Sequence, residues 1–333
     1  MKGGTGSRRK LVILDVGHGN CAVLQDSNGV VAIDAGLGNA LEIYLREEGI
    51  SRIDVVLISH ADQDHLGGLI SLLASRAVKI GRVRLNTDSM QGSKIWDDLL
   101  YELDHLDQEG QLDFQPNLTR EDPGAYDQGS VEIRVLAPSK YLAGKGPGSR
   151  DRRGRRIRTN TLSAVLRLSE HGKPLALFPG DLDEVGLDNI EGADEGLFAP
   201  VLVFPHHGGR AGAKGLENFV RRLCERVRPK RVVFSIGRGR HGTPLPAVVA
   251  AVRKHVEGVV IACTQLSEHC ASELPKAQPK HLNREFAKGR EGGKCCAGTL
   301  VIDLDGSEGF LPIYEDHQEF IGLAAPSALC RRV

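Results

Sequence analysis

The chain has 333 residues, 41% of them hydrophobic, with 43 basic and 43 acidic side chains. It is long enough to bury one large core or two smaller ones, and its zero net charge excludes a global attraction to nucleic acid. No apolar run approaches the roughly 20 residues that a membrane-spanning helix needs. The basic start, MKGGTGSRRK, lacks the apolar core of a signal peptide. We therefore expect a cytoplasmic protein without membrane contact.

The first third of the chain alternates short apolar strands with loops that carry glycine and aspartate. Residues 11–14, 22–24 and 30–33 are expected to form strands, and Asn28-Gly29 signals a hairpin between the last two. Residues 40–48 follow with the apolar spacing of an amphipathic helix. Because hairpin-paired strands give way to a strand–loop–helix pattern, the order favours a sandwich with outer helices over a doubly wound sheet.

The stretch Ile53–Gly68 carries the densest chemistry in the sequence. Its apolar run, residues 53–58, predicts a buried parallel strand, and leucines recur with helical spacing after it. The loop between strand and helix holds two imidazoles and two carboxylates: His60, Asp62, Asp64 and His65. A solvated loop needs no such density of ligand-type side chains, whereas a site for divalent metal ions does.

Potential metal ligands also follow two later apolar strands. We expect strands over residues 83–86, 131–136, 162–168, 175–178, 197–204, 231–236, 258–263 and 298–304, and helices over 93–107, 216–227 and 247–255. Asp181 follows the strand 175–178, and His206 follows 197–204. Sites are assembled where strands end, so ligand-type side chains after three separate strands indicate one shared site.

These side chains suffice for two divalent ions a few ångströms apart, with Asp181 as the bridge. Such a pair activates hydroxide near neutral pH and clamps the oxygens of a phosphoryl displacement. Zinc and manganese are both compatible, because the set lacks thiolates and its carboxylates are hard ligands. Asp34, at the end of a neighbouring strand, is expected to orient a ligand histidine, the alternative being a turn-forming aspartate before glycine.

These motifs resemble the metallo-β-lactamase fold superfamily. The resemblance rests on HADQDHLGG, with IDAG upstream and PGDLD and FPHHGG downstream. More narrowly, DVGHGN, TNTLSAVL, RPKRVVFSIG and RHGTPLP resemble the metallo-hydrolase domain of ComEC-type DNA-uptake proteins and their free-standing relatives. This resemblance implies an α/β (α+β) fold, a four-layer αββα sandwich of two mixed sheets with flanking helices. We expect a flexible N-terminus at 1–10, the hydrolase domain at 11–264, and a C-terminal extension at 265–333 that completes the sheet.

The resemblance also implies roles for individual residues. It matches His60, Asp62, Asp64, His65, Asp181 and His206 to the metal ligands and Asp34 to the supporting aspartate. Asn160 and Ser163 match an element that stands where many relatives carry a further histidine, so a single-ion resting state stays open. His207 is the alternative to His206, and His18 either joins the site or lines it. Asp64 and His241 are the expected catalytic residues, His241 as a phosphate contact or a proton donor to the leaving group.

Arginine is concentrated in two glycine-rich loops. Arg150–Arg158 and the Gly237–Arg240 loop would supply guanidinium groups suited to phosphates, the alternative for the first being an exposed flexible loop. The candidate contacts are Arg152, Arg153, Arg155, Arg156, Arg158, Arg238 and Arg240. The leading hypothesis is a metal-dependent nuclease or phosphodiesterase acting on DNA, RNA or a nucleotide.

Two other functions stay open. One is a small-molecule hydrolase of lactonase or thioesterase type, and the other is a non-catalytic effector or partner protein with a vestigial metal site. A protein partner in a defence or DNA-processing system is implied by the resemblance alone. The seven cysteines are an odd number, which argues against a full disulfide framework. Four of them are candidate ligands of a structural zinc: Cys263, Cys270, Cys295 and Cys296. Buried reduced thiols are the favoured reading of these four.

Overall fold

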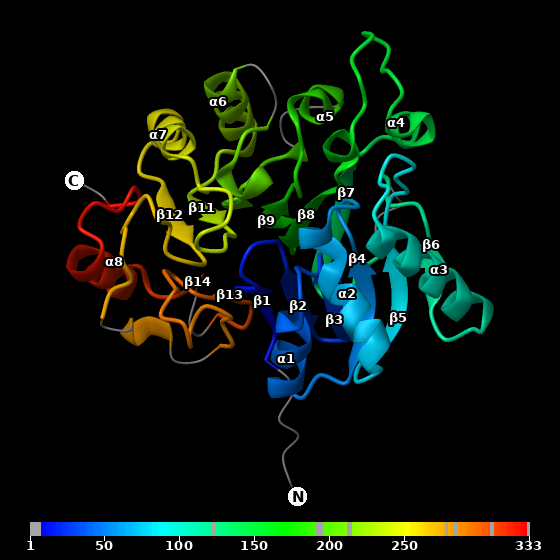
Figure 1. The fold of residues 1–333 in the computed structure, drawn as a ribbon, viewed down its shortest axis with the longest axis horizontal. Helices are drawn as coiled ribbons and strands as arrows, with labels where there is room; N and C mark the ends of the chain where they lie inside the picture. The colour runs from blue at the N-terminus through cyan, green and yellow to red at the C-terminus, as the bar shows by residue number, and fades with distance from the viewer. Residues whose placement is uncertain are drawn as a thin grey trace, which may run out of the picture.

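Two mixed β-sheets stacked face to face form the centre of the molecule. The structure is a computed structural model that describes residues 8–120, 124–190, 196–211, 215–276, 279–282, 285–306 and 310–331. In Figure 1 the layers run from α6 and α7 at the top, through the two sheets, to α1 at the bottom. The predicted architecture, two mixed sheets with flanking helices, is confirmed.

The first sheet combines an antiparallel half with a parallel half. Its strands, in spatial order, are β14 (Phe310–Leu311), β13 (Leu300–Asp303), β1 (Lys10–Ile13), β2 (Ala22–Asp26), β3 (Gly29–Ile33), β4 (Arg52–Leu57), β5 (Lys79–Arg84) and β6 (Asp113–Gln115). The pairs from β14 to β3 are antiparallel and those from β3 to β6 are parallel. Strands from the C-terminal extension thus form one edge, beside β1.

The second sheet also changes from parallel to antiparallel. Its order is β12 (Val260–Cys263), β11 (Arg231–Phe234), β10 (Val201–Val203), β9 (Lys173–Phe178), β8 (Val165–Glu170) and β7 (Val131–Ala137). The strands β9 to β12 are parallel, so β9 and β10 end at the same edge of the sheet. Because parallel strands need a crossover between them, helices connect this half.

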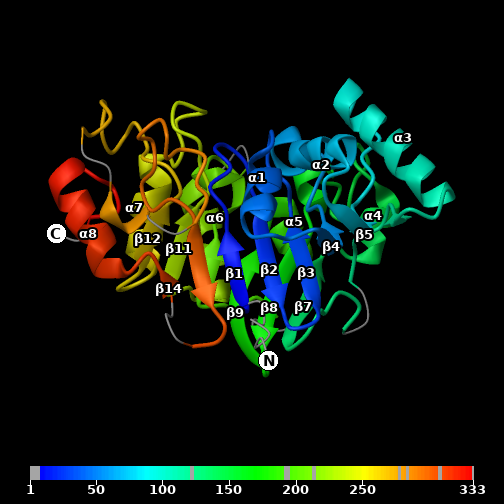
Figure 2. The ribbon, with the colours of Figure 1, turned by 90° about the horizontal axis from the view of Figure 1, so that it is seen from below.

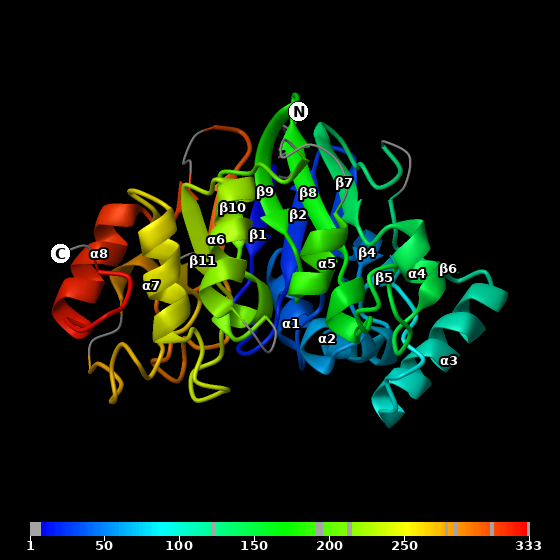
Figure 3. The same ribbon diagram turned by 90° about the horizontal axis from the view of Figure 1, so that it is seen from above.

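Helices cover the outer face of each sheet. Those packed on the first sheet are α1 (Ala40–Glu47), α2 (Gln63–Ser75) and α3 (Lys94–Gln108), seen from below in Figure 2. Those packed on the second are α5 (Glu184–Asn189), α6 (Leu216–Val227), α7 (Pro246–His255) and α8 (Tyr314–Ala324), and Figure 3 shows α5, α6 and α7 from above. The short α4 (Lys140–Lys145) precedes the arginine-rich loop.

Three apolar clusters correspond to the three interfaces between these layers. Leu24 and Val55 of the first sheet pack against Leu166 and Val203 of the second, all buried. The outer helices bury their own apolar stripes against the far faces, for example Leu69 of α2. Central strands such as β1 and β10 are therefore buried on both faces, which explains why they appear in the sequence as continuous apolar runs, whereas β7 near the sheet edge alternates buried and more exposed residues.

Several elements differ from the sequence-based expectation. β8 begins at Val165 rather than at residue 162, because residues Thr159–Leu162 form a 3-10 helix and Ala164 donates its N–H to the Ser59 carbonyl, 2.8 Å away. The short elements β6, β14, α4 and α5 were too brief to give a periodic signal. The helix α8 was missed because its buried stripe is narrow, with His317, Phe320 and Ile321 inside. Among the described residues, no helix combines the length and apolarity needed to cross a membrane.

Candidate metal centre

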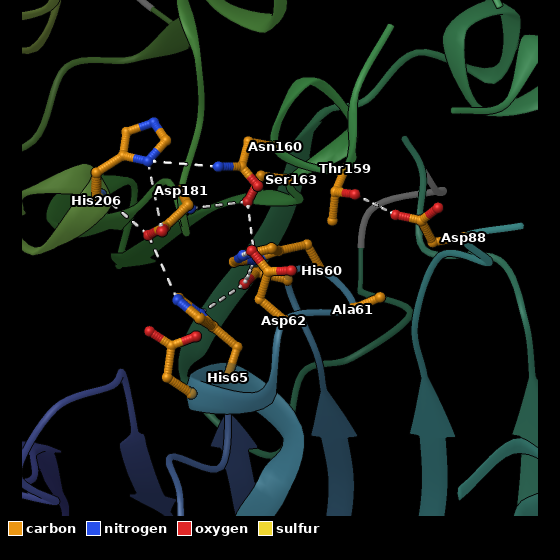
Figure 4. Close-up of polar contacts among 12 residues, drawn as sticks. His60, Ala61, Asp62, His65, Asp88, Thr159, Asn160, Ser163, Asp181 and His206 are labelled. Carbon is orange, nitrogen blue, oxygen red and sulfur yellow. Dashed lines mark hydrogen bonds and ion pairs between the residues drawn. The ribbon is translucent and has the colours of Figure 1, made fainter. Parts of the chain in front are cut away.

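The ends of β3, β4, β9 and β10 deliver histidine and aspartate side chains to one place between the two sheets. Asp34 follows β3, the loop His60–His65 follows β4, and Asp181 follows β9. A 3-10 turn, Pro205–Gly208, follows β10 and carries two histidines. Figure 4 shows Asp181 between His65 below and His206 above. The ligand-type side chains that follow separate strands in the sequence therefore lie together in the fold.

One group of potential ligands consists of His60, His65 and Asp181. A ligand atom from each lies within 4.8 Å of the others, and all three residues are buried. His65 Nε2 is 3.4 Å from Asp181 Oδ1. Asp62 lies beside this group, with its Oδ2 3.3 Å from His60 Nε2. The predicted ligands of the first loop and the predicted bridging aspartate are thus neighbours.

A second group consists of His18, Asp64 and His207. His207 Nε2 is 3.1 Å from Asp64 Oδ2, and His18 Nε2 is 3.3 Å from the same oxygen. His207 Nε2 also lies 3.9 Å from Asp181 Oδ1, so Asp181 adjoins both groups. His18 is therefore one of the potential ligands. The sequence alone left open whether His18 joins the site or only lines it.

The two adjacent histidines take different positions. His207 is buried, and its Nδ1 donates to the Ser235 carbonyl oxygen 2.8 Å away, which leaves Nε2 directed at the carboxylates. His206 Nδ1 lies 3.5 Å from Asp181 Oδ2 and 3.5 Å from Asn160 Nδ2. Both histidines have positive φ angles, 53° and 55°, which non-glycine residues rarely adopt. This backbone lets consecutive side chains face the same centre.

The ligand histidines are oriented through their other ring nitrogen. His65 Nδ1 lies 2.8 Å from Asp34 Oδ2, and Asp34 also accepts the backbone N–H of Ser59 at 2.7 Å. His60 Nδ1 lies 3.0 Å from Ser59 Oγ and 3.4 Å from Ser163 Oγ. Such contacts fix the ring orientation and tautomer of metal-binding histidines.

The opposite nitrogens of these rings are buried without a hydrogen bond. Within the described residues, Nε2 of His60, of His65 and of His206 makes no hydrogen bond, although carboxylate oxygens of Asp62 and Asp181 lie 3.3 Å and 3.4 Å from the first two. Buried polar atoms are normally satisfied, and each exception calls for an explanation such as an ion. Imidazole nitrogens and carboxylate oxygens within 4.8 Å of one another also match the ligand type and spacing of a divalent metal site. The residues present therefore fit a metal ion.

The charges of the two groups stabilise one another. Burial alone would raise the pKa of Asp64, but hydrogen bonds with His18 and His207 hold it far below its usual range. The pKa of Asp181 is likewise held low against burial by the nearby His207 and His65. The pKa of His65 is raised, because Asp34 and Asp181 outweigh its desolvation. The carboxylates are therefore ionised, which is the form that binds a cation.

A close backbone approach holds the loop of His18 against the metal-binding loop. The Asn20 N–H donates to the Asp64 carbonyl oxygen at 3.1 Å. At Gly19, whose φ is +131°, an added Cβ would lie 2.3 Å from that same oxygen. Only glycine allows this approach, so the DVGHGN motif has a steric reason for its second glycine.

His241 and Arg240 lie beside the second group. The His241 ring centroid is 4.7 Å from that of His18, which is in turn 4.5 Å from that of His207. His18, Asp64, Arg240 and His241 all line one pocket of about 510 Å³. His241 is exposed there, a position compatible with the predicted contact to a substrate.

Two of the predicted phosphate contacts are engaged within the protein. Arg155 pairs with Asp151, Nη2 to Oδ2 2.8 Å, and with Asp188 of α5. Arg238 donates to the carbonyl oxygens of Leu266 and Ala271, both at 2.8 Å. We assign these two arginines to holding loops in place, because their guanidinium groups already have partners.

The other predicted arginines differ in their surroundings. The Arg152 guanidinium lies over the Tyr141 ring, 5.1 Å from its centroid. Arg153, Arg156, Arg158 and Arg240 are exposed. Residues Arg150 and Arg156 form an isolated antiparallel bridge, so part of the arginine-rich loop is an ordered hairpin, which projects beside α4 and α5 in Figure 1.

The cysteines of the C-terminal extension are buried and unpaired. Cys295 Sγ donates to Asp15 Oδ2 at 3.4 Å, and Cys296 Sγ lies 3.3 Å from His317 Nε2. In the described part of the chain, neither group of three or more clustered ligand atoms contains a cysteine. Cys263, Cys270, Cys295 and Cys296 therefore do not form such a group with one another.

The αββα arrangement and its strand-end His/Asp cluster define the class of a metallo-hydrolase. The family model of the metallo-beta-lactamase superfamily matches residues 14–212. The chain belongs to this superfamily, as its motifs predicted. Members typically use divalent metal ions, and the two His/Asp groups are the candidate ligands here.

The chain is also similar to individual proteins. The competence protein ComA of Neisseria gonorrhoeae is 26% identical over 263 residues, covering 77% of this chain and 31% of that protein. The chain thus spans about a third of the length of this curated relative. YhfI, a metallo-beta-lactamase fold protein from Bacillus subtilis, is 11% identical, with 76% of this chain and 96% of that chain covered and a TM-score of 0.48. Tm1679, a metal-dependent hydrolase of the beta-lactamase superfamily, is 20% identical, with coverages of 77% and 95% and a TM-score of 0.48.

Proposed function

We propose that the chain is a metal-dependent phosphodiesterase that acts on DNA, RNA or a nucleotide. The observation that carries this proposal is that His18 and Asp64 of the His18–Asp64–His207 group lie in the wall of a pocket with a cationic lining. Asp64 is the only carboxylate among its lining residues, against Arg238, Arg240, Lys288 and Lys294. An excess of positive charge beside a hydrolytic centre favours an anionic substrate over a neutral lactone.

The metal ligands in this proposal come from both groups. His60, His65 and Asp181, with Asp62 beside them, would hold one ion, and His18, Asp64 and His207 the other. Asp181 is placed to serve both, since His65 Nε2 and His207 Nε2 lie 3.4 Å and 3.9 Å from its Oδ1. Bound zinc or manganese would supply Lewis acidity and a water of lowered pKa. His207 thus replaces His206 as the late ligand in our proposal.

The surrounding residues have separate tasks. Asp34 holds His65 so that its Nε2 faces Asp181. Asn160 contacts His206. Ser163 positions Asp181, because its Oγ accepts a hydrogen bond from the Asp181 backbone N–H at 2.9 Å. His241, exposed in the pocket wall, is placed to donate a proton to the leaving oxygen. Positioning and proton transfer are thus supplied from different loops.

The match to a competence protein supports nucleic acid as the substrate, given the resemblance of the motifs to DNA-uptake proteins. A cytoplasmic location and a protein partner in a DNA-processing system fit the same reading and belong to the proposal. The match covers 31% of that relative, so the relative's whole activity is not carried over to this chain.

A metal-screened cleavage assay tests the function. Single-stranded DNA, double-stranded DNA, RNA and cyclic dinucleotides are incubated with the full chain and Zn²⁺, Mn²⁺ or Mg²⁺, with Asp64→Ala as the control. Cleavage that needs metal and is lost in the variant supports the proposal. Ester or lactone turnover without phosphodiester cleavage would replace it with a small-molecule hydrolase. Absence of any turnover with metal bound would favour the non-catalytic alternative.

A further inference from the structure

The C-terminal extension crosses the loop that carries His18. The polar segment 285–299 is hydrogen-bonded to Asp15, the first residue of the DVGHGN motif. The Asp15 carboxylate accepts N–H groups from Gly289 at 2.9 Å and from Gln265 Nε2 at 3.0 Å. Its carbonyl oxygen accepts the Lys288 N–H at 3.0 Å. One fully buried aspartate therefore ties the extension to the metal centre.

This attachment brings Lys288 to the mouth of the pocket. Its Nζ donates to the Leu37 carbonyl oxygen at 3.2 Å. The side chain lies over Gly17, which precedes His18, since an added Cβ on Gly17 would meet Lys288 Cδ at 3.5 Å. Lys288 is exposed, so its ammonium group faces the pocket while its stem covers the loop.

Lys294 and Arg240 line the same pocket from other directions. Lys294 follows a turn of the extension, and Arg240 follows the Gly-Arg-Gly sequence after β11. Both are exposed, and neither side chain makes an ion pair or hydrogen bond within the described residues. Arg238 is the contrasting case, because its guanidinium is saturated by carbonyl oxygens. Three cations are therefore left to face a ligand.

The number of cations exceeds what one reacting phosphate needs. Two metal ions already neutralise the phosphate at the centre of a phosphodiesterase. Lys288, Lys294 and Arg240 add charge beyond that centre, in a space of about 510 Å³, which is of the size that holds a small ligand. Leu37, 44% exposed, adds an apolar surface to the wall. Charge and apolar surface together suit a nucleotide unit with its own phosphate.

We propose that Lys288 and Lys294, with Arg240, form a subsite for the phosphate that flanks the scissile one in a polynucleotide strand. The inference rests on the proposed function and narrows its substrate from any phosphodiester to a chain of nucleotides. The extension then contributes to substrate binding as well as to the edge of the first sheet. Lysine binds phosphate as a point charge, so the contact does not depend on base sequence.

Binding without turnover tests the subsite directly. The full chain in EDTA is titrated into a fluorescein-labelled single-stranded oligonucleotide, and anisotropy gives the affinity at several salt concentrations. Lys288→Ala/Lys294→Ala should weaken binding and reduce the slope of log K against log salt by about 0.7, since both lysines contact the same phosphate and each lost phosphate contact removes about 0.7. Lys288→Gln/Lys294→Gln, which keeps the side-chain stems, should do the same. Lys280→Ala, in the same extension but outside the pocket lining, should leave both values unchanged.

Kinetics separate this inference from the proposed function. Bis(p-nitrophenyl) phosphate has one phosphate and no flanking group, so the double variant should lose several-fold less kcat/KM on this substrate than on the oligonucleotide. The KM for the oligonucleotide should rise several-fold in the double variant, while kcat changes little. The subsite would be overturned if the variant and the wild type had the same salt slope and the same KM. It would also be overturned if the wild type did not bind the oligonucleotide. Failure of the wild type to cleave either substrate would instead refute the phosphodiesterase, while the anisotropy titration would still decide on the subsite.

Discussion

Asp34 Oδ2 lies 2.8 Å from Nδ1 of His65, at the bottom of the metal centre, where both residues are almost fully buried. The contact fixes the ring so that Nε2 faces Asp181 Oδ1 at 3.4 Å. Asp34 has a positive φ of 56°, and its carboxylate also accepts the Ser59 N–H, so it is itself held in place. Orientation of a ligand by a carboxylate is a general feature of histidine metal sites.

Replacing Asp34 is expected to weaken metal binding more than it weakens the fold. Asp34→Asn keeps the shape of the side chain but loses its charge, and we expect metal affinity to fall about 10- to 100-fold. Competition against a chromophoric chelator measures the affinity, and circular dichroism checks the fold. Ser169→Ala, a buried polar change on β8 away from the centre, is the control. Unchanged metal affinity in Asp34→Asn would show that His65 needs no orienting partner.

The adjacent histidines are expected to differ in their effect on metal content. His207→Ala removes the Nε2 that lies 3.1 Å from Asp64 Oδ2, so it should lower metal affinity by more than the 10- to 100-fold typical of orienting residues. His206→Ala removes a side chain that contacts Asn160 and Asp181 at 3.5 Å and should cost less. Metal analysis of the purified variants measures both. A larger loss in His206→Ala would reverse our choice of ligand.

Asp15 is expected to control the attachment of the extension. Asp15→Asn replaces one of the two acceptor oxygens with an NH2 group, so the N–H of either Gly289 or Gln265 loses its acceptor, at a cost of about 1–3 kcal/mol in the free energy of unfolding. Cleavage by protease within residues 265–299 should accelerate, as followed by mass spectrometry. Asp98→Asn removes an exposed ion pair with Lys94 and is the control. It should change neither the free energy of unfolding nor the rate of proteolysis, because exposed ion pairs contribute little to stability. Equal proteolysis in both variants would contradict the role given to Asp15.

His317 is expected to make stability depend on pH in the acid range. Burial lowers its pKa to about 3, whereas the pKa of an unfolded histidine is about 6.5. Between these values the unfolded chain binds the extra proton, so the free energy of unfolding falls as the pH drops, by up to about 1.4 kcal/mol per pH unit. His317→Phe should flatten this dependence, while His105→Gln, on the exposed face of α3, should not. Urea unfolding in EDTA from pH 4 to 8 measures the slope, and parallel slopes for wild type and His317→Phe would refute the assignment.

Much of the fold and of the ligand set is readable from the sequence because the ligands follow apolar strands. Strands buried on both faces appear as continuous apolar runs, and His60, Asp181 and His206 stand directly after such runs. Parallel strands end at a common sheet edge, so local pattern and tertiary position coincide there. This is why the first metal loop and the aspartate after β9 were identified together.

Other parts of the site depend on tertiary contacts that leave no local pattern. His18 reaches Asp64 because Gly19 packs against the Asp64 carbonyl oxygen, a contact between distant segments. The choice between His206 and His207 follows from two consecutive positive φ angles, which neither side chain predicts. Lys288 lies at the pocket because its segment is hydrogen-bonded to Asp15. Arg155 is no longer a candidate phosphate contact, because it forms an ion pair with Asp188. For His18, Lys288 and Arg155 the partner lies far away in the sequence.

The measurement that tests the central claim most directly is phosphodiester cleavage as a function of metal bound per chain. Metal-free protein is titrated with Mn²⁺ or Zn²⁺, and bound metal and cleavage rate are measured on the same samples, with Asp64→Asn alongside. We predict no cleavage without metal, a rate that rises with occupancy and is complete at two ions per chain, and loss of cleavage in the variant. Full cleavage by metal-free protein, or by Asp64→Asn, would contradict the account.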